Sequence, residues 1–476
     1  MKKLIFRKNK VTSFLSCFIG LTIMTGVFSA CSSSNDSNKE SAQDKTSKLV
    51  LYGGPYVNNA LKAAVKIFES KYPEVDVDYR EFGELGDSEA QTNYLEALKY
   101  DLSSGNGPDL IFGNTFEFED IYGMMDSGTF ADINTYLEND EEFKSDLYNE
   151  AVINSGLYNG KRYYIPISYN VLSLVSTQEA LDHAGFKFDS NSDFSGFSSQ
   201  MSEFISKNTN SSDELLFSTY QLGMAAFSPW NGVDAIDYLK SGTYRALYYE
   251  KKKILTDSEE FKASMELYKT YYKMDNRGEE YLTASTGDGA KLIRNNKALF
   301  YYNTSQLSGV LETYSALLDD QTPVLYNFPS FDNKTVAEPE YIAAIRNGSP
   351  NQANAYEFMK ILLSEEYQTK YAINYVDNFN LNVPVLKSAL KAGIEKWLND
   401  HVGGGTPDGS IKFAALSDEE IQLFVDTFGD IDYCTIINGK VRGFVWEAME
   451  PYFKGEKAYD ECLKNLNNKL ELYINE

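Results

Sequence analysis

Aromatic, amide and carboxylate side chains gather in two short segments, and each segment directly follows an apolar run. The segment "GGPYVN" follows "KLVLY", and the segment "GNTFEFED" follows "GPDLIF". Tyr56 and Phe116 offer aromatic faces, while Asn114 and Glu117 can hydrogen-bond hydroxyl groups. Packing explains the two aromatic residues equally well, so the sequence leaves both explanations open.

A second group of candidate residues lies further along the chain. Trp230 and Asn231 stand in "FSPWNG", where the neighbouring proline and glycine favour a loop over a helix face. Tyr302 and Asn303 stand in "FYYNTS" after an apolar run, and Tyr169 and Asn170 stand in "IPISYN" at the expected crossing. Aromatic rings can stack on the C–H face of a sugar while amides bond its hydroxyls, so such residues suit a carbohydrate site.

The residues around the first group predict the elements that would position it. "KLVLY" and "GPDLIF" are short apolar runs typical of buried strands, and "VDVDYREF" alternates with period two. Between them, "NNALKAAVKIFESKY" and "SEAQTNYLEALKYDLSSG" have apolar residues at helical spacing. This alternation predicts an open α/β sheet with helices on both faces. Ligands of such sheets bind beyond the carboxyl ends of the strands, where the two candidate segments lie.

The N-terminal region predicts export and anchoring. Residues 1–30 combine a basic start with a long apolar run, which is typical of a signal peptide. The residues up to Cys31, "SAC", resemble the lipobox of bacterial lipoproteins, and this resemblance implies a diacylglyceryl group on the Cys31 thiol. Residues 31–47 are polar and predict a disordered leash. An uncleaved membrane anchor and an unmodified cysteine are the alternatives.

Composition narrows the possible chemistry. The chain has a net charge of −25, so nucleic acid and anionic membrane surfaces should repel it, and only the lipid anchor should hold it at a membrane. It contains two histidines and four cysteines, which is a poor supply for zinc sites or imidazole catalysis. We expect Cys434 and Cys462 to be buried thiols, although a disulfide between them is possible. No phosphate loop, nucleophile elbow or metal motif is visible, so we expect neither a cofactor nor a metal ion.

Several collinear stretches resemble the family 1 extracellular solute-binding proteins, the receptors of carbohydrate ABC importers. They are "FESKYPEVDVDYREF", "DLSSGNGPDLIF", "MMDSGTFADINTYL" and "GLYNGKRYYIPISYNVLSLVST", and later segments continue the resemblance to the C-terminus. The resemblance implies the two-lobed α/β fold of the periplasmic binding proteins, of the maltose-binding type, with several chain crossings and a ligand cleft between the lobes. We expect the first crossing near Pro166.

The expected domain division follows from this resemblance. Lobe 1 is predicted at residues 48–167 plus 286–345, and lobe 2 at residues 168–285 plus 346–476.

The resemblance also implies a function. The chain is expected to be a monomeric, non-enzymatic receptor that captures a sugar or oligosaccharide and delivers it to the permease subunits of an ABC importer. A receptor of the same fold for a peptide or a polyamine is the main alternative. Because Glu117, Glu119 and Asp120 cluster, a glycoside hydrolase that uses two carboxyl groups is a further alternative.

Overall fold

The computed structural model describes residues 48–187 and 286–475, with short pieces between 196 and 269. Within these ranges the gaps fall at 88, 119, 297, 304–306, 331–332, 377–378, 406–408, 410 and 437. Cys31, Trp230 and Asn231 therefore lie outside the described residues. Among the helices that are described, none combines the length and the apolar character needed to cross a membrane.

A five-stranded sheet organises the N-terminal part of the chain, in the order β2-β1-β3-β12-β6. β1 (Lys48–Gly53) pairs in parallel with β2 (Asp76–Glu81) along its whole length and with β3 (Leu110–Asn114) on its other side. β12 (Tyr341–Ile345) runs antiparallel to β3, and β6 (Ile165–Pro166) pairs with β12. The three strands expected from the sequence are therefore confirmed, and distant segments complete the sheet.

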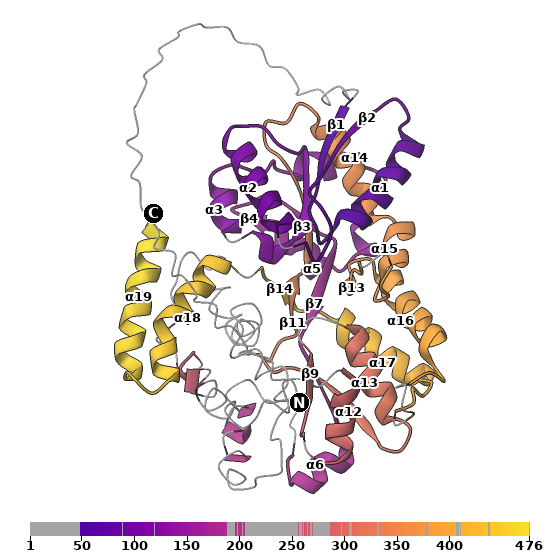
Figure 1. The fold of residues 1–476 in the computed structure, drawn as a ribbon, viewed down its shortest axis with the longest axis vertical. Coiled ribbons are helices and arrows are strands. Elements are labelled where there is room, and N and C mark those ends of the chain that lie inside the picture. Colours follow the sequence, from indigo (N-terminus) through magenta and orange to yellow (C-terminus); the bar gives the residue numbers. More distant parts are fainter. Residues whose placement is uncertain are drawn as a thin grey trace, which may run out of the picture. The chain divides into compact units, whose positions relative to one another are not determined.

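Helices cover both faces of this sheet, as the alternating pattern predicted. α1 (Asn58–Lys71) and α14 (Gln352–Leu363) lie on one face, and α2 (Ala90–Ser103) and α3 (Ile121–Asp126) lie on the other (Figure 1). Ile111 and Phe112 are neighbours in β3 but belong to two separate hydrophobic clusters, because successive strand residues point to opposite faces.

A four-stranded sheet, which we call the connecting sheet, continues directly from the first, in the order β13-β7-β11-β14. Its two inner strands, β7 (Ser168–Val171) and β11 (Val336–Pro339), are antiparallel. Only Ile167 separates β6 from β7, and only Glu340 separates β11 from β12. The chain therefore leaves the five-stranded sheet after Pro166, where a crossing was expected. The outer strands are β13 (Val383–Pro384) and β14 (Tyr433–Cys434).

A three-stranded sheet follows in the order β10-β8-β9. β8 (Ser173–Thr177) is its central strand, and both β9 (Tyr301–Asn303) and β10 (Pro323–Asn327) are antiparallel to it. The helices α6 (Gln178–Ala184), α12 (Thr286–Arg294) and α13 (Leu307–Leu317) accompany these strands.

These pairings differ from the division of the chain expected from the sequence. Residues 286–345 were placed with lobe 1, yet β9 and β10 pair with β8, and only β12 returns to the five-stranded sheet. Likewise α14 was placed in lobe 2, but it packs against α1, β1 and β3. Strand partners far apart in sequence are set by register and side-chain packing, and neither is visible in local pattern.

The remaining helices form the C-terminal part. They are α15 (Glu365–Tyr371), α16 (Lys387–His401), α17 (Asp418–Gly429), α18 (Gly439–Phe453) and α19 (Tyr459–Asn475). α18 and α19 pack together around a hydrophobic cluster of their own, which includes Phe261 and Met265. Cys434 and Cys462 are both buried and free, which confirms the expected pair of thiols.

Short elements complete the described fold. They are η1 (Thr115–Glu117), α4 (Asn134–Leu137), η2 (Ser145–Leu147), α5 (Glu150–Ile153), η3 (Asn154–Gly156), β4 (Leu157–Tyr158) and β5 (Lys161–Arg162).

Candidate functional site

A short turn at the carboxyl end of β3 fixes two of the candidate residues. The Asn114 side-chain oxygen accepts a hydrogen bond from the Phe116 N–H at 3.2 Å, and the Asn114 N–H donates to Glu117 Oε2 at 2.8 Å. These reciprocal bonds form a capping box that begins η1. Because the chain turns sharply here, Phe116 is displayed outside the sheet, with 43% of its surface exposed.

Tyr56 meets Phe116 across the two strand ends. Their ring centroids are 5.0 Å apart and their planes lie at 86°, an edge-to-face arrangement. Tyr56 follows β1, whereas Phe116 follows β3, and these strands are parallel neighbours. The structure thus brings together two aromatic candidates at the carboxyl edge of the sheet, which is where open α/β sheets bind ligands.

Glu117 is buried behind this aromatic pair. Its Oε1 accepts from Gln91 Nε2 at 2.9 Å, in addition to the bond from the Asn114 N–H. Burial raises the pKa of Glu117 to about 7, and the two hydrogen bonds oppose that shift only in part. Burial also raises the pKa of Tyr56, with a smaller contribution from the nearby Glu117 charge. Near neutral pH, Glu117 can therefore both donate and accept hydrogen bonds.

Tyr341 joins the site from a distant part of the sequence. It stands opposite Asn114 in the antiparallel pairing of β12 with β3. Burial raises the pKa of Tyr341, the charge of Glu340 raises it further, and a hydrogen bond with Asn114 opposes the shift. The sequence interpretation missed Glu340 and Tyr341, although the polar pair stands directly before the apolar run of β12 and could have signalled a strand start.

Tyr169 is a core residue and not part of this surface. It is 2% exposed, and its hydroxyl donates to the Phe428 carbonyl at 2.7 Å. Burial raises its pKa. The next residue in β7, Asn170, points to the opposite face, is partly exposed, and accepts a hydrogen bond from Asn382 Nδ2. Of the two candidates at this crossing, Tyr169 therefore faces the core and Asn170 faces the opposite side, because strand side chains alternate.

The remaining candidates are only partly located. Tyr302 and Asn303 lie in β9 opposite Leu174 and Ser173 of β8, and the structure describes their backbone alone. Trp230 and Asn231 stay predictions, since they lie outside the described residues.

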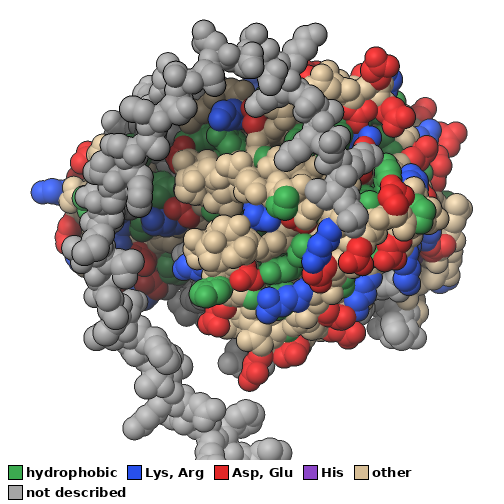
Figure 2. Space-filling view, turned by 90° about the horizontal axis from the view of Figure 1, so that it is seen from above, with side chains coloured by type: hydrophobic (Ala, Val, Ile, Leu, Met, Phe, Trp, Pro, Cys, Tyr) green, Lys and Arg blue, Asp and Glu red, His purple; other side chains and the backbone are tan. Residues whose placement is uncertain are grey.

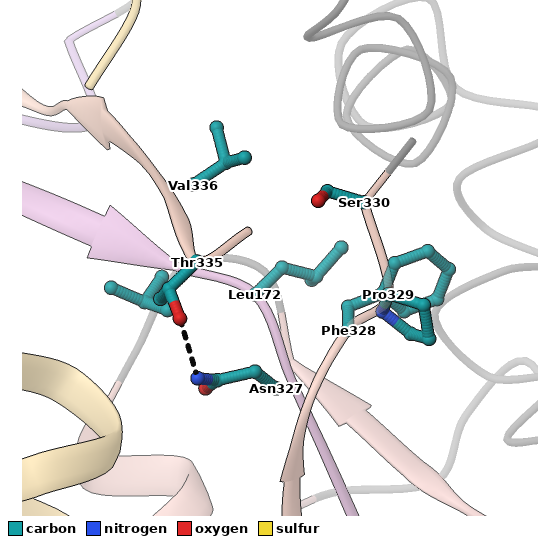
Figure 3. Close-up of a pocket in the computed structure, with 8 residues that line it drawn as sticks. Leu172, Asn327, Phe328, Pro329, Ser330, Thr335 and Val336 are labelled. Carbon is teal, nitrogen blue, oxygen red and sulfur yellow. Dashed lines mark hydrogen bonds between the residues drawn. The ribbon is translucent and has the colours of Figure 1, made fainter. Parts of the chain in front are cut away.

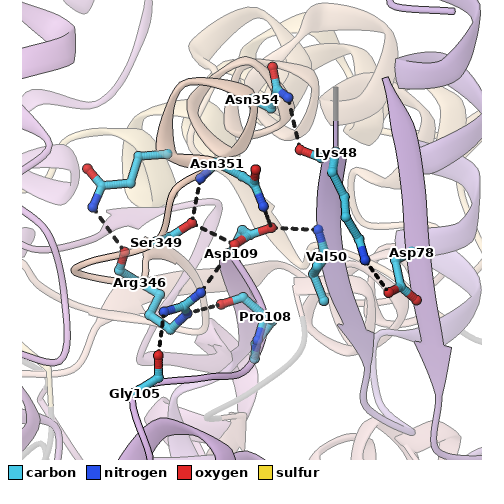
Figure 4. Close-up of polar contacts among 11 residues, drawn as sticks. Lys48, Val50, Asp78, Gly105, Pro108, Asp109, Arg346, Ser349, Asn351 and Asn354 are labelled. Carbon is cyan, nitrogen blue, oxygen red and sulfur yellow. Dashed lines mark hydrogen bonds and ion pairs between the residues drawn. The ribbon is translucent and has the colours of Figure 1, made fainter. Parts of the chain in front are cut away.

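Asp109, the residue before β3, has a structural role. Its Oδ2 accepts from the Val50 N–H at 2.6 Å and from Asn351 Nδ2 at 2.8 Å (Figure 4). Its Oδ1 accepts from Ser349 Oγ at 2.6 Å and from Arg346 Nη2 at 3.3 Å. This network ties β1 and the start of β3 to the segment between β12 and α14, at the end of β3 opposite the candidate site.

Two concavities on the described residues lie apart from this cluster. A cavity of about 10 Å³ lies beside the connection from β10 to β11, where Asn327 Nδ2 donates to Thr335 Oγ1 at 3.1 Å (Figure 3). This space is about that of one water molecule, so the cavity is too small for a metabolite. An open groove of about 530 Å³ lies between α1 and α15, and its lining includes both acidic and basic side chains.

Acidic and basic side chains are interspersed over the face seen in Figure 2. In the described part of the chain, no group of three histidine, cysteine, aspartate or glutamate residues could hold a metal ion.

Comparison with solved structures shows the fold. The sugar-binding protein MalE from Xanthomonas citri matches with a TM-score of 0.58 at 13% identity, covering 90% of this chain and 96% of that one. Maltose-bound MalE3 from T. maritima matches with a TM-score of 0.54 at 15% identity, covering 90% and 99%. The cyclic alpha-maltosyl-1,6-maltose binding protein from Arthrobacter globiformis matches with a TM-score of 0.53 at 14% identity, covering 90% and 98%. The chain therefore has the mixed α/β fold of the periplasmic binding proteins.

Sequence comparison identifies the family. No curated protein matches the sequence. The pattern of the bacterial extracellular solute-binding proteins matches residues 63–401, which is well over half of the chain. The expected resemblance is thereby confirmed, and this chain belongs to the bacterial extracellular solute-binding protein family.

Proposed function

We propose that this protein is the receptor of an ABC importer, and that it captures a sugar or oligosaccharide and delivers it to the membrane permease. The family to which it belongs comprises receptors and not enzymes. The solute, the permease and the anchoring are the parts of this function that we infer.

The aromatic and polar cluster at the carboxyl ends of β1 and β3 carries the proposal. The exposed Phe116 packs edge-to-face against the partly buried Tyr56, and Asn114 and Glu117 belong to the same turn as Phe116. Rings that cover C–H faces next to groups that bond hydroxyls are what a sugar requires. The fold relatives named above bind sugars such as maltose, which supports the same ligand class here. Trp230, Asn231, Tyr302 and Asn303 are proposed as further members of the site.

The contacts of Asp120 argue against the glycoside hydrolase alternative. Asp120 Oδ1 accepts hydrogen bonds from the Gly123 N–H at 3.1 Å, from Tyr473 Oη at 2.8 Å and from Asn438 Nδ2 at 3.1 Å. Asp120 therefore caps α3 and fastens the C-terminal helices. The closeness of Asp120 to Glu117 in sequence is therefore explained by this structural role, and no catalytic pair is needed to explain it.

The proposed architecture is two lobes joined at the connecting sheet. The crossing strands β7 and β11 are paired, and each continues into the five-stranded sheet on one side and toward β8 or β10 on the other. Rotation at these short connections would close the lobes around a ligand.

Lipid anchoring is proposed for the N-terminus, on the basis of the "SAC" sequence that ends at Cys31 and the polar segment after it. Tethering raises the effective concentration of the receptor at its permease. Cys31→Ser is expected to abolish incorporation of labelled fatty acid in a bacterial host. Wild-type labelling of that variant would contradict the lipoprotein assignment.

A thermal-shift screen tests the proposed ligand class. The purified protein is mixed with maltose, maltotriose, cellobiose, xylobiose, raffinose and N-acetylglucosamine, with spermidine and a tripeptide as controls. A ligand that binds only the folded state raises the melting temperature. We expect one or more sugars to raise it and both controls to leave it unchanged. A rise with spermidine or the tripeptide alone would overturn the proposal.

A further inference from the structure

One face of the connecting sheet is polar, although the other face belongs to the core. Tyr169, Val171, Ala337 and Val383 all belong to the large hydrophobic cluster. The residues between them in the same strands point the opposite way, because strand side chains alternate. In the crossing strands they are the polar residues Ser168, Asn170 and Glu338, and the pairing places Glu338 beside Asn170. The two crossing strands therefore share a polar face.

Glu340 stands where this polar face meets the candidate site. Its N–H donates to the Ser168 carbonyl at 3.0 Å, and its own carbonyl accepts from the Thr115 N–H at 2.8 Å. Thr115 begins η1, the turn that displays Phe116. The next residue after Glu340 is Tyr341, which bonds Asn114 of the site. The backbone at Glu340 is thus held by hydrogen bonds to both the crossing and the site.

A chain of amides orients the Glu340 side chain. Asn382 hydrogen-bonds the Glu340 carboxyl, and it also donates from Nδ2 to Asn170 Oδ1. Asn382 is itself fixed, because its Oδ1 accepts from the Leu307 N–H at 2.6 Å. The left-handed backbone at Asn382, with φ of 57°, further restricts that residue. One side of the carboxyl therefore has a rigid partner.

The other carboxyl oxygen has no partner within the described structure. Glu340 Oε2 is covered and makes no hydrogen bond, while the side chain as a whole is partly exposed. A buried acceptor without a donor costs about 1–3 kcal/mol, so such a group in a native fold calls for a partner. Rotation about the last bond of a glutamate is soft, so an approaching group can reach this oxygen with little rearrangement.

Electrostatics determine which partner fits. Burial raises the pKa of Glu340 well above its usual range, and the bond from Asn382 opposes the shift. Burial therefore favours the neutral carboxyl, which can both donate and accept a hydrogen bond. A neutral hydroxyl group matches this chemistry. A polyamine does not, because a cation requires an ionised carboxylate.

We propose that Glu340 is a ligand-binding residue whose Oε2 hydrogen-bonds a hydroxyl group of a neutral sugar, and that Asn382 orients it for this contact. This inference rests on the proposed function and extends the site from η1 onto the crossing strands. It also makes the second crossing part of the binding surface, so that the ligand contacts the segment at which the chain changes sheets.

Isothermal titration of Glu340 variants tests the proposal, with whichever of the six screened sugars binds the wild-type protein most tightly. Glu340→Ala is expected to weaken binding by about tenfold or more, because the hydroxyl loses its partner. Glu340→Gln should weaken it by less than about threefold, since a neutral amide of the same shape still donates and accepts. Glu395→Ala is the matched control, because Glu395 is an exposed glutamate of α16 that contacts only Lys391 among its described ion pairs.

Each outcome decides the proposal. Wild-type affinity in Glu340→Ala would overturn it, and a loss in Glu340→Gln equal to that in Glu340→Ala would overturn the neutral-sugar contact. If Glu340→Ala shows no cooperative melting, Glu340→Asp replaces it. The shortened side chain is expected to keep the melting transition but lose affinity, and unchanged affinity would again overturn the proposal. If none of the six sugars binds the wild-type protein, the proposed function fails first and this inference fails with it.

Discussion

At the residue scale, Phe116 is the aromatic side chain that is best placed to touch a ligand. It is 43% exposed although it is large and apolar, and its only described ring contact is with Tyr56. A ring that covers the apolar face of a sugar should contribute about 1–3 kcal/mol to binding. Phe116→Ala should therefore weaken sugar binding by about tenfold to a hundredfold, as measured by titration calorimetry.

The stability of the same variant separates binding from packing. An exposed ring contributes little to the core, so the free energy of unfolding should change by less than about 1 kcal/mol. Tyr100→Ala is the control, because Tyr100 is 73% exposed in α2 and lies outside the candidate site. Lost stability with intact affinity would assign Phe116 to packing.

Glu117 should make stability depend on pH. Its pKa is about 7 in the folded protein, against an ordinary value of 4.5. Between these values the folded state binds a proton that the unfolded state lacks, so stability falls as the pH rises. This group should lower the free energy of unfolding by about 3 kcal/mol between pH 4.5 and 7.

Glu117→Gln should remove this contribution. Urea unfolding at pH 4.5, 5.5, 6.5 and 7.5 is the measurement, and the variant should lose less stability than the wild type over this range. Glu340 is present in both proteins, and its raised pKa makes stability fall with rising pH in the same way in each. The difference in pH dependence between the two proteins therefore reports Glu117. An identical pH dependence in the two proteins would contradict the buried, proton-binding state of Glu117.

Some site residues could be predicted from sequence and others could not. Tyr56, Asn114, Phe116 and Glu117 follow strands whose apolar pattern is local, so their common location at one sheet edge was predictable. The orientation of Tyr169 was not, because a shift of one residue reverses the face of a strand. The position of Glu340 next to the site was not predictable either, since it depends on the register between β12 and β3.

At the element scale, Asp109 connects β1 to the start of β3. It is 1% exposed and accepts bonds from a backbone amide of β1 and from Arg346, whose side chain is 10% exposed. Asp109→Asn would leave a buried guanidinium without a countercharge, which should cost about 3–5 kcal/mol. Asp78→Asn, which breaks the exposed pair with Lys48, should cost less than about 1 kcal/mol.

Urea unfolding of the two variants gives both numbers. If Asp109→Asn costs no more than Asp78→Asn, the network does not stabilise the sheet.

Some elements of the fold could be predicted from sequence pattern and others could not. The run from β1 to β3 was predictable with its helices, because each element carries its own periodicity. The strands beyond Pro166 could not be predicted in this way. β7 has four residues, β13 and β14 have two each, and β9 has three, so none is long enough to show a period. Their partners are fixed by tertiary contacts between distant segments.

At the scale of the whole molecule, we expect the protein to change shape when it binds its ligand. A ligand that contacts both lobes stabilises the closed form over the open one. Small-angle scattering of the purified protein should give a smaller radius of gyration with a saturating sugar than without it. An unchanged radius at saturation would contradict closure by a hinge at the connecting sheet.

The central claim is that the protein binds a sugar reversibly and does not transform it. Titration calorimetry with the best sugar of the screen, followed by mass spectrometry of the sugar recovered after denaturing the complex, tests this claim most directly. We predict saturable binding at a single site and recovery of the sugar with its mass unchanged. Saturable binding of spermidine or a peptide in place of every sugar, or recovery of a cleaved sugar, would contradict it.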